Sequence, residues 1–144
     1  EVGILNKEFS IDEMIEQRVC FYFQPHGLGH LIGLDVHDAG GYLSFTNPRS
    51  TEPGKRSLRT ARILEEGTVI TVEPGCYFIQ FHLENAFAND KVSKYFNQSK
   101  CIEYYDFGGI RLEDVVVVQK EGCYNLCKDL PRTTDEIEKI MNKS

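Results

Sequence analysis

At 144 residues, with 41% hydrophobic residues, the chain has the length and composition of one soluble globular domain or part of one. Lys and Arg number 16 against 22 Asp and Glu, and the net charge of −6 argues against a nucleic-acid partner. The longest apolar run, VVVV at 115–118, is far too short to cross a bilayer, and the first residues lack the pattern of a signal peptide. We therefore expect no membrane partner.

The cysteines number five, an odd count, and they are scattered along the chain rather than grouped. This distribution favours reduced thiols over a disulfide framework. It predicts a cytoplasmic location.

The first part of the chain predicts one helix, one strand and a long loop. Ser10 and Glu13 have the spacing of a capping box, and apolar residues then recur at helical spacing, which predicts a helix over about 10–19. The aromatic stretch CFYF at 20–23 predicts a strand. Residues 39–57 are rich in Gly, Pro, Asn and Ser, which predicts a surface loop of a length that tends to be functional.

The second part predicts strands and helices in alternation. Strands are expected in GTVITVEPG (67–75), in CYFI (76–79), in GGIRLEDVVVV (108–118) and in CYNLC (123–127), the last two joined by the turn QKEG. One or two irregular helices are expected over 82–100. Thr133 and Glu136 form a second capping box before a closing helix whose apolar stripe is Ile137, Ile140 and Met141. The order predicts an α+β fold with an antiparallel sheet flanked by helices.

The stretch PHGLGHLIGLDVHDAGGY, residues 25–42, holds three of the four histidines among five glycines. Gly27 and Gly29 disfavour a helix here, so the histidines are expected on a loop or at a strand start. Glycine also lets the backbone approach a ligand closely. His26, His30 and His37 are therefore candidates for a binding site, although any single histidine has a simple alternative as a surface or hydrogen-bonded core residue.

Two glutamates at apolar strands add to this case, because a carboxylate there is disfavoured unless it is paired or coordinated. Glu73 ends the strand VITVE, where an exposed rim position is the simple alternative. In GGIRLEDVVVV the strand period of two places Arg111 and Glu113 on the same face. This pair is either a plain cross-strand salt bridge or a carboxylate ligand steadied by a nearby cation.

A rival zinc site must be weighed. HGLGH and CYNLC each have the spacing of structural zinc ligands. The two pairs are far apart in the sequence, unlike those of a compact zinc finger, and Cys123 and Cys127 fit a strand as small hydrophobic residues. We therefore rank this site well below the histidine and glutamate grouping.

Taken together, these residues resemble the metallopeptidases of the pita-bread fold, family M24. The resemblance covers nearly the whole chain, and PHGLGHLIGLDVHDAGGY, EPGKRSLRTARILEEGTVITVEPGCYFI and GGIRLEDVVVV match in the order that the family has. Three motifs in order are a strong signal, whereas EPG alone is not. The long loop and LRTAR point to the branch that hydrolyses Xaa-Pro dipeptides.

The resemblance assigns roles to individual residues. It implies that His30, Glu73 and Glu113 bind two divalent metal ions, with Glu113 as the bridging carboxylate. One imidazole among carboxylates suits manganese first, with cobalt or zinc as alternatives. Glu73, His37 and His26 would be catalytic, and Arg59 would hold the proline carboxylate. His26, His37 and Arg111 would also bind substrate.

The family's metal centre also needs two aspartates well before the histidine segment, and Asp12 is the only aspartate upstream of it here. We therefore expect residues 1–144 to be the carboxy-terminal portion of a catalytic domain, with negligible activity by itself and a tendency to form a homodimer. Two other functions stay open: an Xaa-Pro aminopeptidase of the same fold, and a binding module that has lost catalysis.

Overall fold

The computed structural model describes residues 2–52 and 54–142. Its helices are α1 (Ile11–Glu16), α2 (Gln80–Phe87), α3 (Gln98–Ile102) and α4 (Thr134–Met141), and three further elements, η1 (Val19–Tyr22), η2 (Ser93–Tyr95) and η3 (Tyr105–Phe107), are short 3₁₀ helices. Its strands are β1 (Val69–Val72), β2 (Gly75–Tyr77), β3 (Gly109–Arg111), β4 (Asp114–Val118) and β5 (Cys123–Asn125). The predicted α+β architecture is confirmed.

The strands form two antiparallel sheets, one with the order β1-β4-β5 and one made of β2 and β3. Residues 28–32 run alongside β1, where Thr71 N–H donates to the His30 carbonyl at 2.9 Å and Leu31 forms a bridge with Ile70. His30 therefore lies at the edge of the larger sheet, next to β1. This agrees with the expectation of a loop or strand start.

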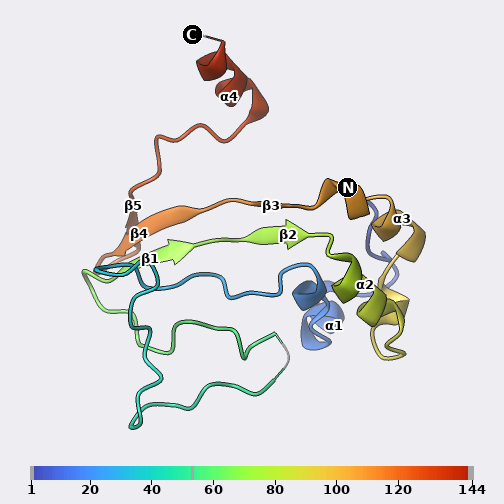
Figure 1. The fold of residues 1–144 in the computed structure, drawn as a ribbon, viewed down its shortest axis with the longest axis horizontal. Coiled ribbons are helices and arrows are strands. Elements are labelled where there is room, and N and C mark those ends of the chain that lie inside the picture. The colour runs from blue at the N-terminus through green and yellow to red at the C-terminus, as the bar shows by residue number, and fades with distance from the viewer. Residues whose placement is uncertain (1, 53, 143–144) are drawn as a thin grey trace.

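Helices α1, α2 and α3 gather at one end of the sheets, whereas α4 stands apart (Figure 1). Residues 39–52 and 54–66 run along the other side of the sheets from α4, and Gly54 reaches the Phe21 ring of η1 (Figure 1). The core belongs to the helical end, where Leu83, Ala86 and Cys101 are 0% exposed and Tyr95 is 1% exposed. Aromatic rings close this core in edge contacts, with the Phe9 and Tyr95 centroids 4.9 Å apart. Burial of such side chains is the dominant contribution to stability at this end.

The first helix is shorter than predicted, and its capping box is only half formed. The Ser10 hydroxyl accepts from the Glu13 N–H at 3.1 Å, as expected. The Glu13 carboxylate does not return to the cap but accepts from the Tyr95 hydroxyl at 2.6 Å and from Lys94 at 3.1 Å. The helix ends at Glu16 because Arg18 adopts a left-handed conformation with φ of 58°.

The prediction of a strand at CFYF was wrong, because residues 19–22 form the 3₁₀ helix η1. Val19 and Phe23 are buried in the core there. Aromatic composition favours strands through packing rather than through the backbone itself, and here a helical turn supplies the packing.

The other predicted strands and helices are present, with one change. GGIRLEDVVVV is not one strand but two, β3 and β4, separated at Leu112 and Glu113. Thr133 and Glu136 form a complete capping box at α4, and the apolar stripe Ile137, Ile140 and Met141 is exposed on a helix that stands apart from the sheets (Figure 1). Residues 39–52 and 54–57 form no helix or strand, as predicted for a surface loop.

Two predictions made from composition can be compared with the structure. All five cysteines lie in the part of the chain that is described, and each is a free thiol, as expected. None of the helices within residues 2–52 and 54–142 is both long and apolar enough to cross a membrane.

Candidate metal centre

Glu73 and Glu113 lie where both strand pairs are interrupted. Val72 pairs with Asp114 on one side of the interruption, and Gly75 pairs with Arg111 on the other. The register is the same on both sides, so Glu73 falls opposite Glu113. Two like charges directly opposite each other destabilise a sheet unless a cation lies between them.

Arg111 supplies that cation in this structure. Its Nε atom lies 3.8 Å from Glu73 Oε2 and 3.5 Å from Glu113 Oε2. The pKa of the Arg111 guanidinium is raised, first by its hydrogen bond with Tyr77 and then by the charges of Glu113 and Glu73. The two carboxylates therefore share one positive charge.

His30 approaches the same point from the edge of the sheet. Its ring is buried, and Nδ1 lies 3.0 Å from the Leu31 carbonyl, to which it can donate. Nε2 then faces Glu73 Oε1 at 3.1 Å. An imidazole whose Nδ1–H donates to a backbone carbonyl is the usual arrangement of a metal ligand, because that bond fixes the ring and leaves Nε2 to bind.

Thr71 is a part of the site that sequence reasoning missed. Its hydroxyl donates to Glu73 Oε1 at 2.6 Å and accepts from the His30 N–H at 2.9 Å, and the residue is 2% exposed. It therefore holds the carboxylate and the histidine segment together. The signal was available in the sequence, because the strand period of two puts Thr71 of β1 and Glu73, the residue just after β1, on the same face.

Tyr77 is a second missed residue, and it continues the same alternation beyond Gly75. His26 Nε2 lies 2.8 Å from its hydroxyl, and Arg111 Nη1 donates to that hydroxyl at 3.3 Å. A Cβ atom on Gly75 would lie 2.6 Å from the Tyr77 ring, so glycine gives the ring room to fold over the sheet. Tyr77 thus connects His26 to the guanidinium between the carboxylates.

His37 reaches the site through a tight loop. The Asp38 N–H donates to the Leu31 carbonyl at 2.9 Å, which turns the chain back on itself. The His37 and His30 rings then meet edge to face with centroids 4.4 Å apart. His37 is exposed, so one side of its ring is open to a ligand.

Arg59 lies beside the histidine segment through its backbone. The Ala61 N–H donates to the Gly40 carbonyl at 2.8 Å, and a Cβ atom on Gly40 would lie 1.8 Å from the Arg59 carbonyl oxygen. The Arg59 side chain is exposed and forms no hydrogen bond or ion pair with residues 2–52 or 54–142. The structure therefore brings the LRTAR motif to the edge of the site without placing its guanidinium in it.

His30, Glu73 and Glu113, here called the carboxylate–histidine cluster, have donor atoms that fit a metal ion. The 3.1 Å between His30 Nε2 and Glu73 Oε1 is the spacing of neighbouring ligands that each lie about 2.1 Å from one ion. Glu113 contacts Arg111 Nε at 3.5 Å, and among residues 2–52 and 54–142 no three His, Cys, Asp or Glu side chains form a ready metal site.

The rival zinc grouping is not assembled. His30 lies beside β1, whereas Cys123 is on β5, and β4 separates these two strands in the sheet. Cys127 accepts from the Val115 N–H through its sulfur at 3.4 Å, which is a structural role. The histidine pair and the cysteine pair therefore belong to opposite edges of the sheet.

Comparison with known proteins decides the family. The model of metallopeptidase family M24 matches residues 8–120. The chain belongs to this family. It is 48% identical over 140 residues to the Xaa-Pro dipeptidase of Rattus norvegicus, covering 97% of this chain and 28% of that protein. A probable Xaa-Pro aminopeptidase of Pyricularia oryzae is 43% identical over 142 residues, covering 99% of this chain and 30% of that protein.

Among solved structures, zinc-substituted aminopeptidase P of E. coli in complex with product matches with a TM-score of 0.61 and 35% identity. The match covers 99% of this chain and 25% of that structure. As in other M24 members, the fold is pita-bread, of which this chain forms part. The chain spans about a quarter to a third of the length of these relatives.

Proposed function

We propose that residues 1–144 are the carboxy-terminal portion of the catalytic domain of a peptidase that hydrolyses Xaa-Pro dipeptides with two divalent metal ions. The observation that carries the proposal is the placement of Glu73 opposite Glu113, with His30 Nε2 at 3.1 Å from Glu73. The two opposed carboxylates and the oriented imidazole form a site for cations. Arg111 carries one positive charge and so neutralises only one of the two carboxylates. The names of the relatives and the family support the reaction class.

The metal ions would be held by His30, Glu73 and Glu113, with Glu113 as the bridging ligand. Manganese fits this oxygen-rich set, with cobalt or zinc as alternatives. Two metals in such a site acidify water and polarise the scissile carbonyl.

The remaining roles belong to side chains around the cluster. Glu73 accepts the proton of the attacking water and passes it to the leaving nitrogen. His37 donates to the developing oxyanion from its open side, and His26 binds substrate next to it. Arg59 holds the proline carboxylate, since a guanidinium binds a carboxylate through two parallel hydrogen bonds. Arg111 flanks the bridging glutamate and contacts substrate.

Two alternatives remain. An Xaa-Pro aminopeptidase is favoured by the structural likeness to aminopeptidase P. The second alternative is a binding module that has lost catalysis. The sequence argues against it, because the chain retains the proposed metal ligands His30, Glu73 and Glu113 and the proposed substrate contacts. The proposal also includes a homodimer, to which exposed apolar residues such as Ile11, Ile15 and Phe81 could contribute, and a cytoplasmic location.

Metal binding tests the centre directly. In the polypeptide in which this chain naturally occurs, Glu113→Gln should weaken manganese binding by about a hundredfold, because it removes one charged ligand. Isothermal titration measures this change. Glu103→Gln, which removes the same charge from an exposed residue after α3, is the matched control. If wild type and Glu113→Gln bind manganese with equal affinity, the proposed metal centre is refuted.

Substrate length separates the dipeptidase from the aminopeptidase. Arg59→Ala should raise KM for Xaa-Pro dipeptides far more than for longer peptides, because only a dipeptide presents its proline carboxylate at that place. Arg62→Ala removes the same charge three residues away and should leave both KM values unchanged. An equal effect of Arg59→Ala on both substrates would favour the aminopeptidase.

A further inference from the structure

The backbone of the LRTAR motif lies directly against the histidine segment, residues 25–42. A Cβ atom on Gly27 would lie 3.2 Å from the end of the Leu58 side chain and 3.5 Å from the Leu58 Cα atom. A Cβ atom on Gly40 would lie 1.8 Å from the Arg59 carbonyl oxygen. Two glycines of the histidine segment therefore allow residues 58 and 59 to pack closely on it, and they define where the Arg59 side chain begins.

Arg49 holds the same stretch of backbone from the other end of the loop. Its Nη1 atom donates to the Leu58 carbonyl and, at 3.4 Å, to the Arg56 carbonyl. Hydrogen bonds from a charged donor are stronger than those between neutral groups. The Arg49 guanidinium thus links the first part of the loop to the residues that come just before Arg59.

The ring of Tyr42 supports the Arg49 side chain. The guanidinium carbon of Arg49 lies 4.0 Å from the centre of this ring, which is a cation–π contact. Tyr42 has a left-handed backbone with φ of 60°, and Gly41 before it has φ of 107°. A left-handed conformation is costly for a bulky residue, and such strain concentrates at functional sites. The strained turn at residues 41–42 thus ends in a ring that lies against the guanidinium.

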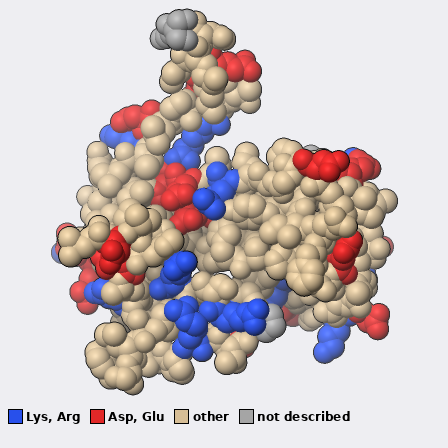
Figure 2. Space-filling model, viewed as in Figure 1, with Lys and Arg blue, Asp and Glu red and all other residues tan. Residues whose placement is uncertain are grey.

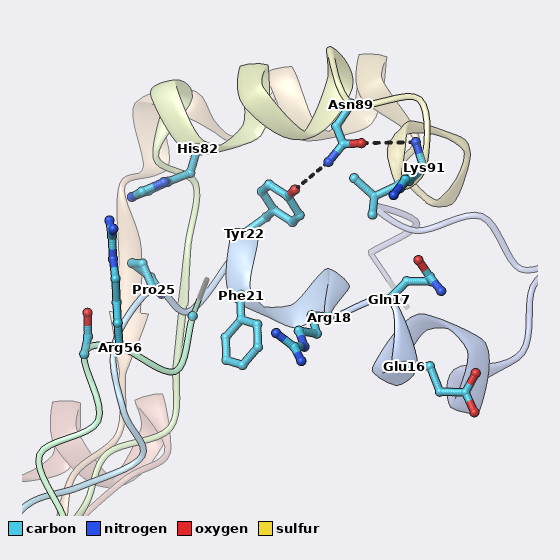
Figure 3. A pocket seen from close by; sticks show the side chains of 13 residues that line it. Glu16, Gln17, Arg18, Phe21, Tyr22, Pro25, Arg56, His82, Asn89 and Lys91 are labelled. Atoms are coloured by element: carbon cyan, nitrogen blue, oxygen red, sulfur yellow. Dashed lines mark hydrogen bonds between the residues drawn. The ribbon is translucent and has the colours of Figure 1, made fainter. Parts of the chain in front are cut away.

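The loop is also anchored at the helical end of the molecule. Gly54 has φ of 81°, and a Cβ atom there would lie 2.3 Å from the Phe21 ring of η1. The Arg56 side chain extends toward His82 in the pocket between this loop and the helical end (Figure 3). Arg56 therefore directs its side chain into that pocket, while its carbonyl group accepts from Arg49.

Charge alone does not decide where this loop would hold an anion. Figure 2 shows basic side chains gathered over the loop on one face of the molecule. Positions 49–62 carry one acidic residue, Glu52, and five basic residues: Arg49, Lys55, Arg56, Arg59 and Arg62. Such a surface attracts a carboxylate as a whole. The placement of each guanidinium then determines which arginine binds it.

From these contacts we propose that Arg49 is a positioning residue for Arg59. It holds the backbone of residues 56–58 so that the Arg59 guanidinium meets the carboxylate of an Xaa-Pro dipeptide. This inference rests on the proposed function, in which Arg59 binds that carboxylate. A small displacement weakens a contact made by two parallel hydrogen bonds. The loss of Arg49 should therefore affect substrate binding and spare the chemistry at the carboxylate–histidine cluster.

Steady-state kinetics on the dipeptide Ala-Pro test this role, in the manganese-loaded polypeptide in which this chain naturally occurs. Arg49→Ala should raise KM about tenfold and leave kcat within about twofold of the wild-type value. Lys55→Ala is the matched control, because it removes a charge from the same loop and its ammonium contacts Glu52 at 2.8 Å. Equal rises of KM in the two variants would overturn the inference, since loss of charge would then be the cause.

A double-mutant cycle shows whether Arg49 acts through Arg59. In the Arg59→Ala background, Arg49→Ala should change KM by less than about twofold, because the group that it positions is gone. A tenfold rise in both backgrounds would overturn the inference, because Arg49 would then act without Arg59.

Tyr42→Asn provides a second variant that leaves Arg49 in place. It removes the ring beside the guanidinium, and asparagine tolerates the left-handed backbone at this position. KM should again rise only when Arg59 is present. Manganese affinity, measured by isothermal titration, should stay at the wild-type value in Tyr42→Asn and Arg49→Ala. If both variants lost manganese affinity, the loop would support the whole site rather than Arg59, and the inference would be wrong.

The same measurements separate this inference from the proposed function. If Arg59→Ala leaves KM for Ala-Pro unchanged, the proposed role of Arg59 fails, and the positioning role of Arg49 fails with it. If Arg59→Ala raises KM but Arg49→Ala does not, only the positioning role of Arg49 fails.

Discussion

The helical end of the molecule and the segment that carries the site are built in opposite ways. At the helical end, α2, η2 and α3 bury Leu83, Tyr95 and Cys101 almost completely. The described residues of the segment 24–68, which exclude residue 53, form no helix or strand, and the segment is held by close approaches of Gly29 to β1, of Gly40 to Arg59 and of Gly54 to Phe21. One region is stabilised by apolar burial and the other by close approach of the backbone. The comparison teaches that different substitutions should damage the two regions.

The largest effect is expected in the core of the helical end. Leu83→Ala should lower the free energy of unfolding by about 3 kcal/mol, because Leu83 is 0% exposed and its loss leaves a cavity. Urea unfolding measures the change. Phe81 is 70% exposed on the same helix, so Phe81→Ala should cost well under about 1 kcal/mol. Similar losses for the two variants would show that this end is not packed as described.

The second largest effect is expected on metal affinity, when a glycine of the histidine segment is replaced. A Cβ atom on Gly29 would lie 1.9 Å from the Thr71 carbonyl oxygen, so Gly29→Ala must push residues 28–32 away from β1. Metal affinity should fall by at least about tenfold, because His30 moves with this segment. At Gly27 the nearest atom is the end of the Leu58 side chain at 3.2 Å, which can move.

Gly27→Ala is therefore the matched control for Gly29→Ala. Isothermal titration with manganese in both variants makes the comparison. If Gly29→Ala binds metal as well as Gly27→Ala does, the backbone contact does not position His30.

A smaller effect is expected at Thr71. Thr71→Val keeps the shape of the side chain but removes the donor to Glu73 and the acceptor for the His30 N–H. Loss of such a supporting contact typically weakens metal binding by about tenfold. Thr68→Val, at the far end of the same strand region, is the control, because Thr68 Oγ1 accepts from Glu65 instead. A Thr71→Val variant with unchanged metal affinity would confine Thr71 to a structural role.

The smallest effect concerns pH at the helical end. The pKa of Glu13 is lowered from its ordinary value of 4.5 by hydrogen bonds from Tyr95 and Lys94. A carboxyl group with a lowered pKa stabilises the fold above its unfolded-state value, and this contribution is lost as the pH falls through the folded-state value. Glu13→Gln should therefore weaken the loss of stability below pH 4.5.

Thermal unfolding at a series of pH values measures this dependence. Glu16→Gln removes the same charge from α1 without touching Tyr95 or Lys94, and it should retain the wild-type slope. A slope that changes equally in both variants would mean that overall charge, rather than the hydrogen bonds of Glu13, controls acid stability.

Much of the fold was accessible from local patterns. Val69–Val72 and Asp114–Val118 were predicted as strands because β-branched residues crowd together there, and the capping box at Thr133 marked α4 correctly. CFYF was misassigned because its aromatic residues satisfy a 3₁₀ turn packed on the core as well as they would satisfy a strand. The true end of α1 was missed because a left-handed Arg18 leaves no signature in the sequence.

The sequence by itself determined which side chains could serve the site: the histidines among glycines, the glutamates at strand ends, and the arginine that shares a face with one of them. Only the tertiary structure decided that Glu73 stands opposite Glu113, that Thr71 and Tyr77 support them, and that Arg59 stays at the edge. Residue types are set by local chemistry, which the sequence records. Pairing across strands depends on register between distant segments, which is fixed only when the whole chain packs together.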